Sequence, residues 1–298
     1  MRQAATPAHL RSLFACLAAI AGVSFAQGPA ISPTPNVSHL LISVRSKEEL
    51  PELTTADFEI KEDGKLAPVQ QVRRVGRLPL RYCLLFDISG SEHEEFKSQQ
   101  DLAERVIELV VVPKTDLGWL SLFSLQSNDG AETDNPKDIL AMVSLARSYG
   151  PTALYDAVAQ CSARMERSPA DSRVRVMFLF SDGGDNQSHI ASGEAIERAV
   201  NAGVRIFSFA PEVPNDSHRS KGINVMKRLG EATGGQFLTA SRGRDADKVA
   251  TTINHDLSNL YSVSYAAASP GIRPRKLDIK CTKHGVSVVS HSFVSSGN

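Results

Sequence analysis

The pattern of apolar and polar residues changes twice along the chain. From residue 80 to residue 258, continuous apolar runs such as 82–86 alternate with segments such as 94–112, in which apolar residues recur at helical spacing. Continuous apolar runs are typical of parallel strands buried on both faces, and helical spacing predicts amphipathic helices. This alternation predicts an α/β fold, a doubly wound and mostly parallel sheet with helices on both faces. Further strands are expected at 119–125, 174–180 and 204–209, and further helices at 136–147, 153–167, 192–202, 225–233 and 245–260.

Both flanks of this region have the pattern of β-strands. The segment 57–62 alternates apolar and polar residues and runs into Asp63-Gly64, a dipeptide typical of hairpin turns. Because β-rich segments lie at both ends of the chain, we expect the two flanks to pair into a small accessory β unit. The strands expected in the flanks are 39–45, 57–62, 69–75, 260–265, 277–281 and 286–289.

The first residues have the layout of a secretory signal peptide. Arg2 and Arg11 precede the apolar run 13–23, and small residues follow at 24–26. We expect cleavage after about Ala26 and a secreted or periplasmic protein. An uncleaved membrane anchor is the alternative, although the run is short for spanning a bilayer. The expected parts are a signal peptide (1–26), a linker (27–38), an N-terminal β segment (39–79), an α/β domain (80–258) and a C-terminal β segment (259–298).

Charge and composition narrow the classes of partner. The 33 basic and 33 acidic residues cancel, and removal of Arg2 and Arg11 with the signal leaves 31 against 33, a net charge of −2. Proteins that bind nucleic acid usually carry a basic surplus, so we expect no nucleic-acid partner. No later apolar run reaches membrane-spanning length, so we expect no transmembrane segment in the mature chain. The mature cysteines Cys83, Cys161 and Cys281 are expected to be small buried hydrophobic residues, and one bridge among them is an open alternative.

Oxygen-bearing side chains follow two of the expected parallel strands. Asp87, Ser89 and Ser91 come directly after the run 82–86, and Asp182 follows the strand 174–180. Ligands of open α/β sheets bind at the carboxyl ends of the strands. Carboxylates and hydroxyls are hard ligands that suit Mg²⁺ or Mn²⁺ better than Zn²⁺.

A third segment supplies one more hydroxyl. Thr152 lies at the start of the helix expected at 153–167, where it is either a ligand or a plain helix cap. Asp185 and Asn186 are expected to shape the loop after Asp182, with Asp185 as an accessory ligand in the alternative interpretation. For the serines, the alternative is a turn with local hydroxyl hydrogen bonds.

At these residues the sequence resembles the von Willebrand factor type A (VWA) family. Asp-Xaa-Ser-Xaa-Ser at 87–91, Gly-Pro-Thr-Ala-Leu-Tyr-Asp-Ala at 150–157 and Ser-Asp-Gly-Gly-Asp-Asn at 181–186 are similar to its metal-ion-dependent adhesion site (MIDAS). The segments 53–64 and 260–265 look like the exported bacterial group of VWFA-related acidobacterial-type domains. The resemblance implies a VWA/Rossmann-like fold and a site for Mg²⁺ (or Mn²⁺ or Ca²⁺). The ligands that it implies are Asp87, Ser89, Ser91, Thr152 and Asp182.

The resemblance also implies a function in binding. A protein ligand would offer an acidic side chain to the metal, in adhesion, assembly or scaffolding and without catalysis. The sequence departs from the family at Glu92, where Met is frequent, and acids crowd the following positions. Such a carboxylate could bind the metal, discourage an acidic partner, or lie in a first helical turn where acids suit the helix dipole.

Two other functions remain open. The first is a structural VWA module without metal-dependent binding. The second is a Mg²⁺-dependent hydrolase with Asp87 as nucleophile, which would usually need a second acid where Ser89 stands. The sequence has no Gly-Xaa-Ser-Xaa-Gly elbow and no Gly-Xaa-Xaa-Xaa-Xaa-Gly-Lys loop, so we expect no enzyme.

Overall fold

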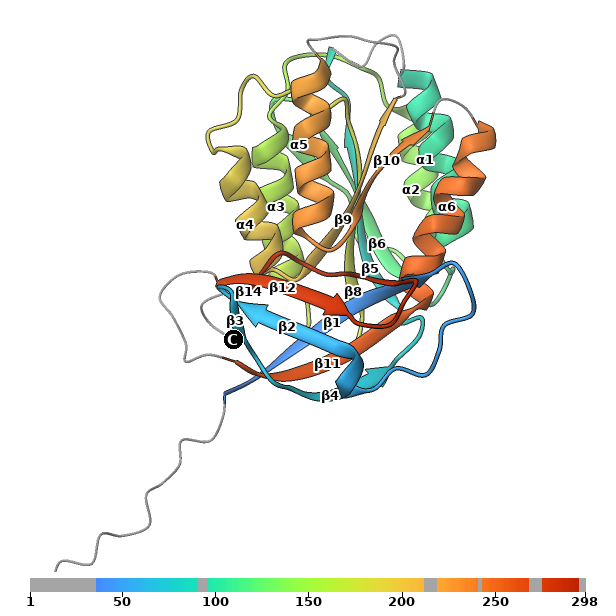
Figure 1. Ribbon diagram of the computed structural model, residues 1–298. Helices are drawn as coiled ribbons and strands as arrows, with labels where there is room; N and C mark the ends of the chain where they lie inside the picture. Colours follow the sequence, from blue (N-terminus) through green and yellow to red (C-terminus); the bar gives the residue numbers. More distant parts are fainter. Residues whose placement is uncertain (1–35, 91–95, 212–218, 241–242, 268–274, 295–298) are drawn as a thin grey trace, which may run out of the picture. The chain divides into compact units, whose positions relative to one another are not determined.

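A six-stranded sheet runs through the middle of the chain, as the computed structural model shows for residues 36–90, 96–211, 219–240, 243–267 and 275–294 (Figure 1). Its strand order is β10-β9-β8-β5-β6-β7, and all neighbouring pairs are parallel except β6 and β7. The expectation of a doubly wound, mostly parallel sheet is therefore confirmed. The strands are β5 (Leu80–Asp87), β6 (Leu117–Phe123), β7 (Ser127–Asp129), β8 (Val174–Phe180), β9 (Val204–Pro211) and β10 (Gln236–Ala240).

Helices cover both faces of this sheet. Helices α1, α2 and α6 pack on one face, and α3, α4 and α5 on the other. Side chains alternate along a strand, so Tyr82 and Leu84 of β5 enter one apolar layer while Cys83 and Leu85 enter the other. The helices are α1 (Phe96–Val110), α2 (Pro136–Leu145), α3 (Leu154–Arg167), α4 (Ser192–Asn201), α5 (Arg219–Ala232) and α6 (Gly243–Ser258).

The two flanks pair with each other, which confirms the expected accessory β unit. Strand β1 (Asn36–Ser46) lies between β11 (Leu260–Ala267) and β13 (Val286–Val289), and β4 (Val69–Arg74) extends that sheet. A second sheet has the order β14-β12-β2-β3, and an apolar core that includes Ile42, Ile60 and Tyr265 draws on both sheets. The strands of the second sheet are β2 (Phe58–Glu62), β3 (Lys65–Leu66), β12 (Arg275–Cys281) and β14 (Phe293–Val294), and a 3-10 helix, Thr55–Asp57, precedes β2.

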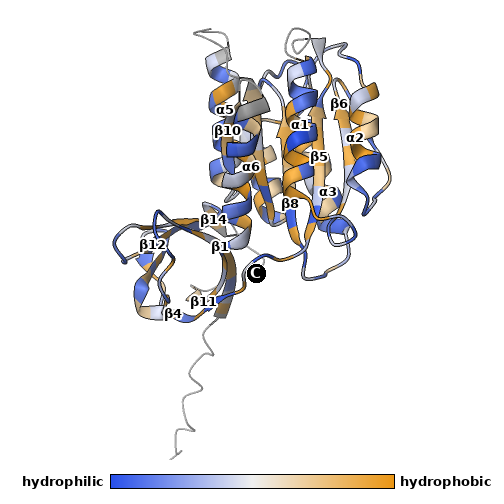
Figure 2. Cartoon of the chain, turned by 90° about the vertical axis from the view of Figure 1, so that its right-hand side faces the viewer, coloured by the Kyte–Doolittle hydropathy of each residue, from blue (hydrophilic) through white to orange (hydrophobic). Residues whose placement is uncertain are grey.

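The accessory β unit lies at the amino-terminal edge of the parallel sheet. In Figure 1 it is below the six strands, and the loops that follow β5 and β8 are above them. Figure 2 shows the most apolar residues on the central strands, between the two helical layers. The carboxyl edge of the sheet, at which Asp87 ends β5, is therefore not covered by the accessory unit.

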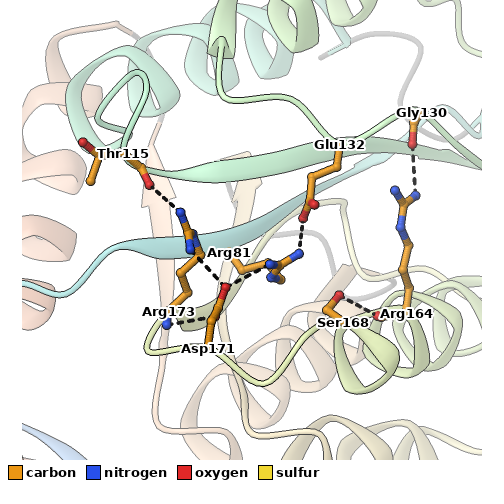
Figure 3. Close-up of polar contacts among 8 residues, drawn as sticks. All are labelled: Arg81, Thr115, Gly130, Glu132, Arg164, Ser168, Asp171 and Arg173. Atoms are coloured by element: carbon orange, nitrogen blue, oxygen red, sulfur yellow. Dashed lines mark hydrogen bonds and ion pairs between the residues drawn. The ribbon is translucent and has the colours of Figure 1, made fainter.

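A network of charges ties the amino-terminal ends of the strands together (Figure 3). Arg81 of β5 is almost fully buried and forms ion pairs with Glu132 and with Asp171, which precedes β8. Arg173 donates to Asp171 at 3.0 Å as well. These contacts support the pairing of β5 with β8, whose opposite ends lead to Asp87 and Asp182.

Some element boundaries differ from those expected. Strand β10 was not expected, because a five-residue edge strand has too short a pattern and is defined by its pairing with β9. Helix α5 begins at Arg219, six residues before the expected start at 225, because Gly222 weakens the local helical signal. Cys83 and Cys161 are free and buried as expected, and Cys281 is free and only partly buried.

Several sequence expectations lie outside the described residues. These are the signal peptide and its cleavage after Ala26, together with Ser91 and the acids that follow it. None of the helices in the described part of the chain combines the length and apolar character that a membrane crossing requires.

Candidate metal centre

Three loops meet at the carboxyl edge of the parallel sheet. The loop after β5 contacts the segment before α3, because the Gly90 N–H donates to the Gly150 carbonyl at 2.8 Å. That segment in turn contacts the loop after β8, because the Asn186 N–H donates to the Thr152 carbonyl at 3.0 Å. The three motifs of the sequence therefore lie side by side, although 89 residues separate the first (87–91) from the last (181–186).

Asp87 is a fully buried carboxylate with short hydrogen bonds. Its Oδ1 accepts from the Ser89 N–H at 2.8 Å, and its Oδ2 accepts from the Ser181 hydroxyl at 2.6 Å. Burial raises the pKa of Asp87 to about 6, the hydrogen bonds from Ser181 and Ser89 act against that rise, and the charge of Asp182 adds to it. The charge of Asp182 thus disfavours the ionised form of Asp87, and a cation at this edge of the sheet would offset that effect.

Asp182 follows β8 in a turn that requires glycine. The Gly184 N–H donates to Asp182 Oδ1 at 2.7 Å, and Asp182 is partly exposed. Gly183 has a φ of +80°, and a Cβ there would lie 2.3 Å from the Gly222 carbonyl oxygen of α5. The close approach of α5 therefore fixes the turn that carries the Asp182 side chain.

Thr152 is buried, and both sides of its backbone are held by the loop after β8. Its N–H donates to Asn186 Oδ1 at 3.1 Å, and its carbonyl accepts from the N–H groups of Asn186 and Gln187, each at 3.0 Å. The residue is only 3% exposed. These hydrogen bonds all use the backbone of Thr152, so none of them occupies its hydroxyl.

The interpretation of Thr152 as a plain helix cap is wrong. The residue at the N-cap of α3 is Ala153, whose side chain cannot cap. The Leu154 N–H instead donates to Asp185 Oδ1 at 2.8 Å, and the Ser188 hydroxyl donates to that same oxygen. Asp185 therefore faces the start of α3 in the loop-shaping role that the sequence suggested.

Ser89 and Ser91 are the remaining candidate ligands. Ser89 is fully buried next to Asp87, and its carbonyl accepts from the Ser148 hydroxyl at 2.7 Å. Ser91 lies outside the described residues. Sequence reasoning missed Ser181 and Ser188; the position of Ser181 between a buried strand and Asp182 was the available signal.

The donor set fits a hard divalent cation. Among the described residues, no three His, Cys, Asp or Glu side chains gather as a metal-binding group. A cation at this edge would have the carboxylates of Asp87 and Asp182 and would depend on hydroxyls for further protein ligands. Such an all-oxygen set suits Mg²⁺, Mn²⁺ or Ca²⁺ and does not suit Zn²⁺.

The chain is similar in fold to several solved structures of other proteins. No protein-family model and no curated protein matches the chain. Among solved structures, a von Willebrand factor type A protein from Catenulispora acidiphila is 9% identical with a TM-score of 0.50, covering 90% of this chain and 74% of that one. BatB from Bacteroides thetaiotaomicron is 13% identical with a TM-score of 0.48, covering 60% of this chain and 97% of its own.

A third solved structure is similar in the same way. The manganese-loaded TRAP protein from Plasmodium vivax is 14% identical with a TM-score of 0.47, covering 77% of this chain and 98% of its own. At sequence identities this low, the similarity shows the fold alone. Together with the strand order and the two helical layers, the likeness to the Catenulispora protein confirms that the chain has the von Willebrand factor type A fold.

Proposed function

We propose that this chain binds a divalent cation at the carboxyl edge of its parallel sheet and, through the cation, an acidic side chain of a protein ligand. The observation that carries the proposal is the meeting of three groups. These are the buried Asp87 carboxylate, the Asp182 carboxylate of the loop after β8, and the buried residue Thr152, whose backbone is held by that same loop. Ser89 and Ser91 are the remaining proposed ligands.

The charge balance supports a role in binding. Mg²⁺ prefers six oxygen ligands and usually keeps several waters. Two carboxylates balance the formal charge of a divalent cation, and the neutral hydroxyl ligands add no further negative charge. A water position can therefore be taken by a carboxylate of a partner, with Mn²⁺ or Ca²⁺ as alternatives to Mg²⁺.

The setting of this activity is part of the proposal. We place the chain outside the cytoplasm, secreted or periplasmic after cleavage near Ala26, and assign metal binding to the domain 80–258. The resulting role is adhesion, assembly or scaffolding. A structural VWA module without metal-dependent binding is the second candidate, and a Mg²⁺-dependent hydrolase is the third.

Titration of the protein with Mn²⁺ or Mg²⁺ in a calorimeter tests the metal site. We expect one bound cation per chain and at least about tenfold weaker binding in Asp182→Ala, because one of two coordinating charges is lost (about 1.4 kcal/mol). Asp101→Ala, which removes an exposed carboxylate on α1, is the matched control and should bind as wild type does. A wild-type protein that binds neither cation would favour the structural module.

Capture of partners from envelope extract tests the role of the metal. Partners should be retained by wild type, and lost with EDTA or in Asp182→Ala. Retention that ignores both changes would contradict the metal-bridged mechanism. Mg²⁺-dependent hydrolysis of a phosphoester panel that disappears in Asp87→Ala would instead support the hydrolase.

A further inference from the structure

The loop after β8 holds the Thr152 peptide on both sides. The Asn186 side chain accepts from the Thr152 N–H at 3.1 Å, and the backbone N–H groups of Asn186 and Gln187 donate to the Thr152 carbonyl at 3.0 Å. Only one of these three contacts uses a side chain. We call these three hydrogen bonds the clamp. Asn186 is the residue whose side chain the clamp requires, because the other two contacts use backbone N–H groups.

The same loop also caps the helix that follows Thr152. The first N–H groups of an α-helix have no partner within the helix and usually find one in the N-cap side chain. In α3, Asp185 Oδ1 accepts from the Leu154 N–H at 2.8 Å, while the Ser188 hydroxyl oxygen accepts from the Tyr155 and Asp156 N–H groups at 3.0 and 3.2 Å. Three side chains of one loop therefore hold the segment that carries Thr152.

From this geometry we infer that Asn186 is a positioning residue for the cation site. It fixes the Thr152 backbone relative to the Asp182 loop, so that the Thr152 hydroxyl is in place before a cation arrives. The inference rests on the proposed function, since it concerns the affinity of that same site. Its physical basis is preorganisation: a segment that is already ordered does not have to lose conformational freedom when the ligand binds.

The affinity for Mn²⁺ tests this inference. Asn186→Ala and the similarly sized Asn186→Leu both remove the acceptor for the Thr152 N–H, and each should weaken Mn²⁺ binding about fivefold, which is about 1 kcal/mol. Asn186→Asp keeps an acceptor at the same place and should bind Mn²⁺ at least as tightly as wild type. Rescue by Asp would not follow from a merely space-filling role.

Gln187→Ala is the matched control. Gln187 contributes only its backbone N–H to Thr152, and its exposed side chain has no part in the clamp, so its replacement should leave Mn²⁺ affinity unchanged. Hydrogen exchange in the metal-free protein gives an independent measurement, because the Thr152 amide should exchange faster in Asn186→Ala and Asn186→Leu than in Gln187→Ala.

The possible results separate the two proposals. If wild type binds Mn²⁺ and the Ala and Leu variants bind it as tightly, with unchanged exchange at Thr152, Asn186 has no positioning role and only this inference fails. If wild type takes up no Mn²⁺, the proposed function fails and the inference falls with it. If the Ala and Leu variants weaken Mn²⁺ binding and Asp restores it, the inference stands.

Discussion

At the scale of single residues, Arg205 of β9 is a buried cation away from the metal centre. It is buried, and burial lowers its pKa to about 10 against the opposing charge of Asp256. Its guanidinium donates to the Leu41 carbonyl, to the Ser43 hydroxyl at 2.7 Å and to the Gly234 carbonyl at 3.2 Å. One cation thus satisfies polar groups of strand β1 and of the turn between α5 and β10.

Replacement of Arg205 by Met should lower the free energy of unfolding by about 2–4 kcal/mol, because buried acceptors are left without donors. Urea denaturation measures the change. The control is Arg198→Met, which removes an exposed cation that pairs with Glu194 within α4 and should cost about 0.5 kcal/mol or less. Equal stability losses in the two variants would contradict the structural role of Arg205.

At the scale of elements, helix α5 approaches the Asp182 loop without room for a side chain. A Cβ on Gly222 would lie 2.5 Å from the Asp182 carbonyl oxygen and 2.9 Å from the carbonyl carbon of Gly183. Glycine in a helix costs about 1 kcal/mol relative to alanine. The close contact explains why the helix nevertheless carries one here.

Gly222→Ala should therefore destabilise the protein by about 1–3 kcal/mol and weaken Mn²⁺ binding, since α5 must shift away from the Asp182 loop. Gly193→Ala on α4 is a matched control, because a Cβ there meets nothing within 4 Å and should be neutral or slightly stabilising. Thermal unfolding and Mn²⁺ titration are the measurements. A stabilising effect of Gly222→Ala would contradict the prediction, because α5 would then move away from the Asp182 loop without cost.

At the scale of the whole described chain, the accessory β unit joins the parallel sheet through a charged junction. Arg45 of β1 pairs with Asp256 of α6 and donates to Gln236 of β10 at 2.7 Å. The backbone of His291 forms an isolated antiparallel β-bridge with that of Thr233. His291 also lines a cavity of about 450 Å³. Other charged residues that line this cavity are Lys227, Glu231 and Asp278.

Acid should weaken this junction through His291. Burial, and secondarily the charge of Arg205, lower the pKa of His291 to about 4, below its ordinary value of 6.5. The unfolded chain therefore binds the proton first, and the stability contributed by neutral His291 is complete above pH 6.5 and lost as the pH falls toward 4. The contribution is at most about 3 kcal/mol.

Urea denaturation of wild type and His291→Gln at several pH values measures this contribution. Asp87, whose pKa is raised to about 6, acts with the opposite sign over much of the same range, so the difference between the two proteins is the informative quantity. The plots of unfolding free energy against pH for the two proteins should differ in slope between pH 4 and 6.5. Parallel curves for the two proteins would contradict the prediction.

Sequence reasoning predicted the fold well where the local pattern is strong. Strand β8 was expected at the residues where it occurs, because the five consecutive apolar residues 176–180 give a strong local signal. Strand β10 was missed because it is defined by its pairing with β9, and the early turns of α5 were missed because Gly222 weakens the local helical signal. Of the candidate ligands, Asp87 ends β5, and Ser89, Thr152 and Asp182 lie on loops that the structure brings together with it, while the full ligand set remains a prediction.

The sequence by itself determined the alternation of strands and helices and the kinds of side chain at the carboxyl edge of the sheet. These follow from periodicity and from residue type, which are local properties. The tertiary structure alone decided that Ser181 holds Asp87, that Asn186 holds Thr152 and that β1 pairs with β11. Such contacts join residues far apart in the chain, and no local pattern specifies which buried donor meets which acceptor when the layers pack.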